Sequence, residues 1–434
     1  MEEYSSILLQ EEEYWALKSR INVAAFGDRY TSYFHVTTVV RRQRNKIRCL
    51  KNSVGEWIVD TDAVKKHILM GFEKLYTTEL SLSQRQSPIS DFSCCFLSEE
   101  ESAWVGREVV EEDVKNGLRS LKPFKAPGVD GLHAGFYQQF WHEVGKSVSE
   151  VVMDVFVKGV VLEYLNDTLI TLIPKCSSPE TLNNYRPISL CNSVYKVISK
   201  IIVSRIRPFI GKLIAPVQTA FVPRWKGIDN VLIAQELFFA LDRKKGKEGF
   251  MAIKVDLEKA YDRLEWSFIY KVLQAFHFPQ NIIKVIMSCV TSTRISILFN
   301  GGTLDPFIPT RGLRQGDPIS LYLFILCMEF LGHLIEQKCV VGDWKPLKAS
   351  RGNIGITHLS FADDLILFAK IEENTCEVIS EVLNRFCKES GQKVSLEKSR
   401  IYFLQMSKRE SKRRYALTWE SKLRQISVNI LVFR

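Results

Sequence analysis

The spacing of apolar residues predicts helices through the first half of the chain. Apolar residues recur every three or four positions over 110–121 and again over 148–156, which predicts two amphipathic helices. The turn-forming stretch KPFKAPGVDG, residues 122–131, separates them. Further predicted elements are a strand, TLITLIPK at 168–175, and helices over 192–210 and 229–245.

Beyond residue 250 the pattern changes to short strands that alternate with helices. Within ITHLSFADDLILFA, residues 356–369, two apolar arms flank Asp363 and Asp364, which predicts a hairpin with both acids at its tip. The other predicted elements are strands over 250–256 and 294–302, helices over 266–276 and 281–290, and a helix after QGDP (315–318). Together these elements predict an α+β core in which helices pack around a small sheet.

The N-terminal 52 residues contain a strongly basic segment. Residues 1–52 predict a helix followed by the basic segment VVRRQRNKIRCLKN, with Tyr33 and Phe34 just upstream. Cations beside aromatic rings suit a nucleic-acid surface, although a solvated charged helix face has the same pattern. The Ser-rich polar stretch from roughly 80 to 100 predicts a linker.

Composition narrows the class of protein. Hydrophobic residues make up 46% of the chain and charged residues 25%, which excludes a disordered protein, and the net charge of +10 favours polyanionic partners. Ten cysteines without a C-x-x-C pair favour a reducing compartment over a zinc site or a disulfide framework. The acidic start lacks a signal-peptide pattern, and Glu329 interrupts the longest apolar stretch, 321–335, which is too short to span a bilayer. We therefore expect a soluble intracellular protein with no membrane partner.

Three aspartates suggest the chemistry. Asp363 and Asp364 are adjacent within an apolar run, and an apolar strand ends at Asp256 in KVDLEKAYD. Unpaired carboxylates in apolar surroundings are costly, so a cation should meet them. Three carboxylates suit a pair of Mg²⁺ ions, which can activate a 3′-hydroxyl and stabilise a leaving pyrophosphate. Taken singly, an Asp at a strand end is also typical of a turn or a cap, and an Asp-Asp pair of a solvated turn.

Seven motifs follow one another along the chain: IPK, NYRPISL, QTAFV, DLEKAYD, RGLRQGDPIS, FADD and SGQKVSLEKS. This series resembles the reverse transcriptase of LINE-type, non-LTR retrotransposons, most closely the forms common in plants. The resemblance runs from about residue 8 to about 405 and includes EEEYWALKSR and GDRYTSYFH, which resemble the segment joining endonuclease to polymerase in such elements. It implies the fingers and palm of a right-hand polymerase, with a small antiparallel sheet, packed helices and an N-terminal helical extension.

The resemblance also implies a division of the chain. The expected parts are a helical and basic region over 1–80, a linker over 81–109, an N-terminal extension over 110–164, a reverse transcriptase domain over 165–405 and a basic tail over 406–434. After Leu404 the tail is too short for a thumb, so the thumb is expected to be largely missing. No endonuclease, RNase H domain or zinc knuckle is expected, which indicates a piece of a longer element.

By resemblance, Asp256, Asp363 and Asp364 are the catalytic and metal-binding triad, and the carbonyl of Leu257 completes a metal shell. The expected cofactor is a pair of Mg²⁺ ions, with Mn²⁺ as a possible substitute. Tyr261 matches the aromatic residue whose ring clashes with a 2′-hydroxyl and so selects deoxynucleotides; core packing is the alternative role for its ring.

The resemblance assigns nucleotide contacts to five more residues. Lys175 and Arg186 match fingers residues that hold the triphosphate, the first as a point charge and the second as a fork. Gln315 and Gly316 match the segment against the nascent base pair, where backbone approaches closely. Lys398 matches a lysine that protonates pyrophosphate, although a surface lysine would look the same.

Nucleic-acid contacts come from two other stretches. LKPFKAPGVDG resembles an extension that such elements share with group II intron maturases, which makes Lys122 and Lys125 candidate template contacts. Arg311, in RGLRQGDPIS, is a third candidate. The implied partners are an RNA template, a DNA primer and dNTPs, without a small-molecule cofactor and with protein partners unknown. The resemblance alone implies nuclear action.

Two departures from the family pattern leave the triad untouched. Leu321 stands where relatives have Pro, and FVPRW at 221–225 lacks the Gly expected in a tight turn, which can cost about 1 kcal/mol. Three hypotheses follow: an RNA-directed DNA polymerase, a catalytically silent nucleic-acid-binding remnant, or a splicing-associated maturase. NYRPISL and SGQKVSLEKS disfavour the third.

Overall fold

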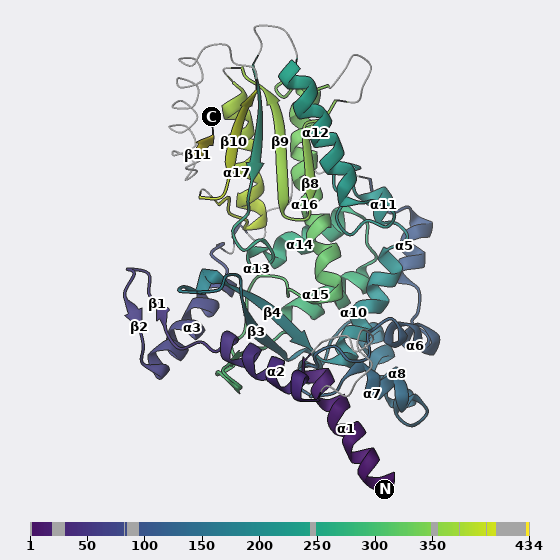
Figure 1. Cartoon of the computed structure of the whole chain (residues 1–434). Coiled ribbons are helices and arrows are strands. Elements are labelled where there is room, and N and C mark those ends of the chain that lie inside the picture. The colour runs from purple at the N-terminus through teal and green to yellow at the C-terminus, as the bar shows by residue number, and fades with distance from the viewer. Residues whose placement is uncertain are drawn as a thin grey trace.

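Two β-sheets form separate parts of the molecule, as the computed structural model shows (Figure 1). The structure describes residues 2–19, 31–81, 83–84, 95–243, 249–348, 355–372, 374–395, 397–404 and 431–433. Residues 82 and 85–94 of the expected linker, the start of GDRYTSYFH and almost all of the basic tail at 406–434 lie outside these residues. Part of the expected linker region 81–109 is the helix α5 (Glu99–Gly106).

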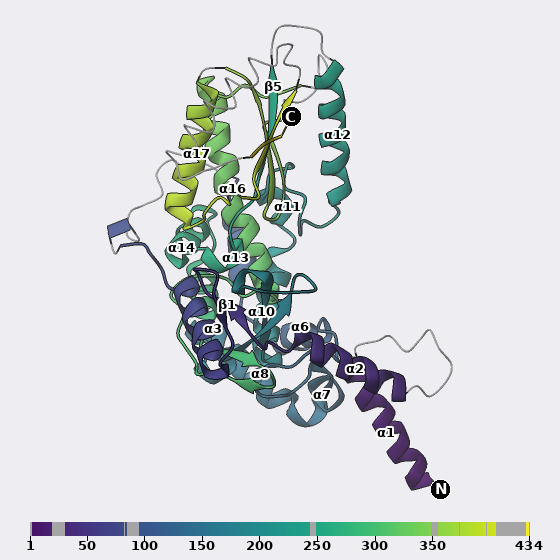
Figure 2. The same cartoon turned by 60° about the vertical axis from the view of Figure 1, so that its left-hand side comes forward.

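The first sheet has the strand order β11-β10-β5-β9-β8. Its strands are β5 (Phe250–Val255), β8 (His358–Phe361), β9 (Asp364–Lys370), β10 (Arg400–Leu404) and β11 (Leu431–Phe433). All neighbours are antiparallel except β10 and β11. On one face, residues such as Val255 and Leu365 join the main core with α16 (Pro318–Val341) and α17 (Thr375–Ser390). On the other face, α12 (Gly227–Arg243) covers Phe250 and Phe368 at the far end of the strands (Figure 2).

The second sheet has the strand order β4-β3-β6-β7. The prediction of one small sheet was therefore incomplete. Its strands are β3 (Thr168–Pro174), β4 (Tyr185–Cys191), β6 (Ile295–Phe299) and β7 (Gly302–Thr303). The helix α3 (Thr61–Tyr76) covers it with Val64, Ile68, Phe72 and Tyr76, which share one helix face because they are four residues apart. Beside them, β1 (Leu50–Lys51) and β2 (Trp57–Ile58) form a short antiparallel pair.

The predicted helices are confirmed, with ends that differ by a few residues except at the start of α8 (Trp141–Lys158), which begins seven residues before the predicted apolar face. They correspond to α6 (Glu111–Arg119), α8, α10 (Ser193–Ile206), α12, α14 (Trp266–Ala275), α15 (Gln280–Thr291) and α16. Four short helices also appear: α7 (Ala134–Gln139), α9 (Glu163–Asn166), α11 (Ile210–Leu213) and α13 (Ala260–Arg263). At the N-terminus, α1 (Glu2–Ser19) projects from the rest of the molecule, and α2 (Thr31–Asn45) joins it to the body (Figure 2).

The helix α16 is the longest of the described elements. Asp317 caps it by accepting a hydrogen bond from the Ile319 amide, Pro318 occupies the first turn, and Gly342 ends it with φ of +88°. Among the described residues it is the one helix that could cross a membrane by length and apolar composition, contrary to the shorter stretch expected. Its most apolar window is 67% buried inside the protein, as is usual for a core helix.

Candidate active site

The predicted hairpin is confirmed, and its acids lie at the tip rather than inside the apolar arms. The last pair joins Phe361 of β8 to Asp364 of β9, which leaves Ala362 and Asp363 as a two-residue loop. Ala362 has φ of +55°, the left-handed conformation that short hairpin loops demand. Both aspartates are exposed, so their charges do not have to be buried in the core.

Asp256 lies at the same end of this sheet. Val255 of β5 pairs with Leu365 of β9 in antiparallel register. Asp256 directly follows Val255, and Asp364 directly precedes Leu365, so the two acids are neighbours across the sheet. The backbone of Asp256 is fixed on both sides, since its carbonyl accepts from the Ser395 amide at 2.7 Å and its amide donates to Ser399 Oγ at 3.1 Å. Two sequence segments more than a hundred residues apart thus bring their carboxylates to one sheet edge.

The three carboxylates influence one another. Partial burial raises the pKa of Asp363, the nearby charges of Asp364 and Asp256 raise it further, and Arg186 opposes them. Asp364 Oδ1 lies 3.6 Å from Lys254 Nζ, and Asp256 Oδ1 lies 3.7 Å from Lys398 Nζ. Negative charge is therefore concentrated here and is only loosely neutralised by the protein's own cations.

A divalent cation fits the donor chemistry of this edge. Asp256 Oδ1 is buried and accepts no hydrogen bond from the described residues, although hard cations favour such oxygens. Leu257 directly follows Asp256, and its carbonyl was expected to be a metal ligand. This residue forms an isolated β-bridge with Val394. Within the described ranges, no three His, Cys, Asp or Glu side chains already stand close enough together to enclose an ion. The oxygen ligands are thus of the right type, while their side chains stand apart.

Four cations lie near these acids and influence one another: Lys175, Arg186, Lys259 and Lys398. Burial lowers the pKa of Lys175, and the charges of Lys398 and Arg186 lower it further. Burial likewise lowers the pKa of Lys259, with Lys175 and Lys398 adding to the effect. The charges of Asp262 and Asp256 offset part of this effect, and an anion such as a triphosphate would stabilise the cluster further.

Lys259 was not singled out from the sequence. It precedes α13 in the left-handed conformation, with φ of +49°, and its Nζ donates to the Tyr185 carbonyl at 3.4 Å. In sequence it resembles any lysine at the start of a helix. Its one signal was its place inside DLEKAYD, three residues after Asp256.

Tyr261 has the core packing that was its alternative role. Its ring stacks on Phe324 with centroids 4.4 Å apart and planes 18° apart, which is core packing. Burial raises the pKa of the Tyr261 hydroxyl well above its ordinary value, and the Asp363 charge contributes. The ring is therefore held by packing, and its hydroxyl group is close enough to Asp363 to interact with its charge.

Gln315 and Gly316 lie against the second sheet. The Gln315 carbonyl accepts from the Ser189 amide at 2.8 Å, and its side-chain Nε2 lies 3.1 Å from both carboxylate oxygens of Asp262. Gly316 is exposed with φ of +115°, and a Cβ there would approach Ser189 O to 3.0 Å. Glycine is thus required by the backbone conformation as well as by close approach.

Asp262 is a second residue that the sequence did not single out. It is fully buried, burial raises its pKa to about 6, and the Tyr76 hydroxyl donates to Oδ1 at 2.8 Å. Because Tyr76 belongs to α3, the N-terminal region is connected through Asp262 to Gln315. Nothing in the local sequence could reveal a partner 186 residues away.

The three expected nucleic-acid contacts are placed differently from one another. Lys122 and Lys125 are exposed on the loop between α6 and α7. The Arg311 side chain is 2% exposed; it lies 3.2 Å from Glu79 and 3.6 Å from Glu265, and Nε donates to the Leu75 carbonyl. This burial differs from the expected role, since the guanidinium is used inside the protein and offers no face to a phosphate.

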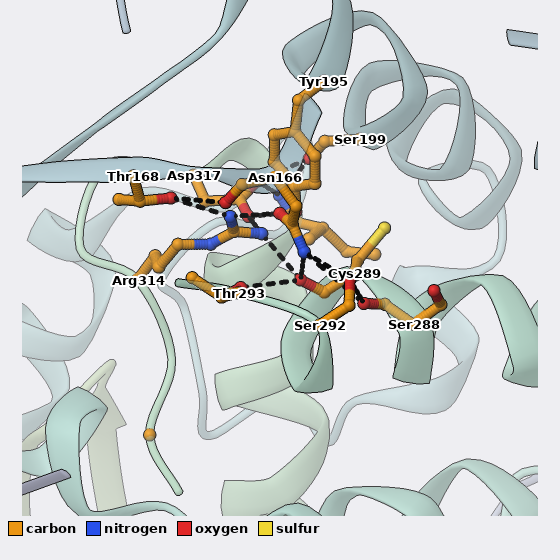
Figure 3. A network of polar contacts seen from close by, with 12 residues as sticks. Asn166, Thr168, Tyr195, Ser199, Ser288, Cys289, Ser292, Thr293, Arg314 and Asp317 are labelled. Atoms are coloured by element: carbon orange, nitrogen blue, oxygen red, sulfur yellow. Dashed lines mark hydrogen bonds and ion pairs between the residues drawn. The ribbon is translucent and has the colours of Figure 1, made fainter. Parts of the chain in front are cut away.

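A second buried arginine fixes the same loop (Figure 3). Arg314 is ion-paired with Asp317 at 3.0 Å and donates to Asn166 Oδ1 at 2.5 Å. Asp317 also accepts from the hydroxyls of Tyr195 and Ser199 at 2.5 and 2.7 Å. Gln315 and Gly316 therefore lie between two residues that are anchored in the core.

Comparison with known proteins gives this arrangement a context. The model of a family described as "Reverse transcriptase (RNA-dependent DNA polymerase)" matches residues 173–430. The uncharacterized 149 kDa protein of transposon TX1 from Xenopus laevis is 26% identical over 82% of this chain and 26% of its own length. The Pol polyprotein of type-2 retrotransposable element R2DM from Drosophila melanogaster is 25% identical over 67% of this chain and 26% of its own.

The RNA-directed DNA polymerase from mobile element jockey of Drosophila funebris is 23% identical over 84% of this chain and 39% of its own length. The chain thus spans about a quarter to two-fifths of the length of these three relatives.

Proposed function

This chain belongs to the reverse transcriptase family, and from that premise we propose that it extends a DNA primer on an RNA template. The observation that carries the proposal is the position of Asp256 beside the Asp363–Asp364 tip, with four cations near these acids. Similarity to proteins of TX1, R2DM and jockey supports a LINE-type element, and we propose the form common in plants, acting in the nucleus.

In this proposal the first sheet is the palm and the second sheet, covered by α3, belongs to the fingers. Asp256 and Asp363 are the main ligands of two Mg²⁺ ions, for which Mn²⁺ can substitute, with Asp364 and the Leu257 carbonyl as further ligands. When bound, such ions lower the pKa of a 3′-hydroxyl and neutralise the charge of a leaving pyrophosphate.

The protein's own side chains bind and orient the nucleotide. Lys175, Arg186 and Lys259 hold the triphosphate, and their mutual repulsion is relieved by its negative charge. Lys398, near Asp256, donates a proton to pyrophosphate. Gln315 and Gly316 border the new base pair, and Tyr261 is held by Phe324 where it excludes a 2′-hydroxyl. Lys122 and Lys125 contact template phosphates.

Primer extension on poly-rA/oligo-dT tests the proposal. We expect Mg²⁺-dependent incorporation of dTTP that falls by at least about 100-fold in Asp363→Asn, because a ligand of the metal ions that neutralise developing negative charge is lost. Asp305→Asn, which changes an exposed aspartate, serves as the matched control and should retain activity. Equal incorporation by the parent and Asp363→Asn would mean contamination, and would leave the chain a silent nucleic-acid-binding remnant.

A further inference from the structure

We propose that Gln218, from the motif QTAFV, is a positioning residue that fixes the loop carrying Asp363. The effect that Gln218 is expected to have on metal binding rests on the function proposed above. Gln218 is 3% exposed and lies between α11 and α12, far from Asp363 in sequence. No chemistry was assigned to it from the sequence.

The side chain of Gln218 engages both backbone groups of one residue. Its Oε1 accepts from the Ala362 amide at 3.0 Å and from the Ala220 amide at 3.1 Å, while Nε2 donates to the Ala362 carbonyl at 3.4 Å. The carbonyl of Ala362 belongs to the peptide that leads into Asp363. Gln218 therefore determines the orientation of the peptide from which the Asp363 side chain departs.

Ala362 needs such support. Its φ of +55° is unfavourable for a residue with a Cβ, and a buried amide without an acceptor would add a further cost. Ala362 is itself only 6% exposed, so water cannot readily replace Gln218. Ala362 also packs in the main core, so the Gln218 hydrogen bonds act together with packing to hold this loop.

Gln218 is itself anchored from the backbone. The Ser360 amide donates to the Val217 carbonyl at 2.9 Å, and the Thr219 amide donates to the Ser360 carbonyl at 3.2 Å. From α12, Asn230 Nδ2 donates to the carbonyls of Val217 and Ser360, both at 2.9 Å. Residues 217–219 are thus held beside β8 by backbone hydrogen bonds. The Gln218 side chain then holds Ala362, at the hairpin tip, relative to this segment.

Exchange and metal binding test the proposal on the full chain. Gln218→Met keeps the side-chain volume and removes the hydrogen bonds. We expect the Ala362 amide to exchange with deuterium at least tenfold faster and the affinity for Mn²⁺ alone, followed by electron paramagnetic resonance, to fall about tenfold. Gln138→Met is the matched control, because Gln138 Nε2 also donates to two backbone carbonyls, those of Leu118 and Leu121, but in another part of the molecule. It should leave both readouts unchanged.

Gln218→Glu separates hydrogen bonding from packing, and it serves if Gln218→Met does not fold. It keeps an acceptor for the Ala362 amide, so slow exchange is expected to persist. Fast exchange in Gln218→Glu, or unchanged exchange and Mn²⁺ affinity in a folded Gln218→Met, would overturn the proposal. If the parent chain extends no primer, the proposed function fails, while the exchange measurement still decides the role of Gln218.

Discussion

At the scale of single residues, Lys259 shows how a fold selects a functional side chain. Its left-handed backbone conformation lies between β5 and α13, and its ammonium group is near the cations Lys175 and Lys398 as well as the Asp262 carboxylate. Because burial and the two like charges outweigh Asp262 and lower the pKa of Lys259, a further anion would stabilise the charged lysine. The conformation of Lys259 therefore supports a role in holding a phosphate.

Lys259→Ala should raise the KM for dNTP by about tenfold to a hundredfold with kcat changed much less, because a charge-assisted hydrogen bond contributes roughly 1.5–3 kcal/mol. Steady-state primer extension over a dNTP series measures this. Lys284→Ala, at an exposed lysine of α15, is the control. An unchanged KM in Lys259→Ala would remove the residue from the triphosphate site.

Arg224 occupies the position where a glycine was expected, and its φ of +70° matches that expectation. The side chain is exposed, so its removal costs little packing. Arg224→Gly should raise the free energy of unfolding by about 1 kcal/mol, since glycine adopts this conformation without strain. Urea unfolding measures it, and Arg224→Ala should give no gain. A loss of stability in Arg224→Gly would contradict the argument.

At the scale of elements, the sequence predicted most helices and the hairpin because their apolar spacing is regular. It predicted that Asp256 and the FADD acids would converge, and they do lie at one sheet edge. It missed β4, whose alternation is interrupted by Pro187. The burial of Asp262 and Arg311 depends on α3, and no local pattern reports contacts with a helix so far away in sequence.

The start of α16 depends on the Arg314–Asp317 pair. Removing either partner leaves a buried charge, so Arg314→Met and Asp317→Asn should each lower the free energy of unfolding by about 3–5 kcal/mol. The double variant should lose much less than the sum. Chemical denaturation of all four proteins measures the coupling. Additive losses would show that the two residues act independently, and Lys338→Met, at the more exposed pair with Glu381, should cost less than about 1 kcal/mol.

Within α16, Glu329 accepts from the Ala215 amide at 3.2 Å, and burial raises its pKa to about 7. The folded protein thus binds a proton more tightly than the unfolded chain, so stability falls as pH rises from about 4.5 to 7. Glu329→Gln removes this loss and should be more stable than the parent by up to about 3 kcal/mol at pH 8, but not at pH 4. Thermal unfolding of the parent and Glu329→Gln at pH 4 and pH 8 measures this difference in stability. An equal difference at the two pH values would exclude the titration of Glu329 as its cause.

At the scale of the whole molecule, the N-terminal region forms part of the body of the fold. The family match begins at residue 173, yet α3 lies well before it and covers the second sheet. Through Tyr76 it also reaches Asp262 beside Gln315. The fingers proposed here therefore need residues that precede the matched region.

Deletion of residues 1–94 should expose the face of the second sheet. The four α3 side chains that cover it contribute roughly 1.5–3 kcal/mol each, a sum comparable to the stability of a domain. We expect rapid proteolysis in β3 and β4, measured by limited chymotrypsin digestion, because both strands contain leucine or tyrosine. Deletion of residues 1–30 removes only the projecting α1 and its connection, and should leave the digestion pattern unchanged. Equal resistance of both truncated chains would contradict this role of α3.

During synthesis, α16 leaves the ribosome before all of its surroundings exist. Its neighbours α10 and α14 precede it in the chain, whereas α17 is complete only at Ser390. For some fifty residues of translation, 24 mostly apolar residues of membrane-spanning length are therefore only partly covered. Nascent chains in this state are prone to aggregation and to capture by chaperones. Soluble expression of this protein should therefore depend more on how fast residues 342–390 are translated than on any exposed side chain of the finished fold.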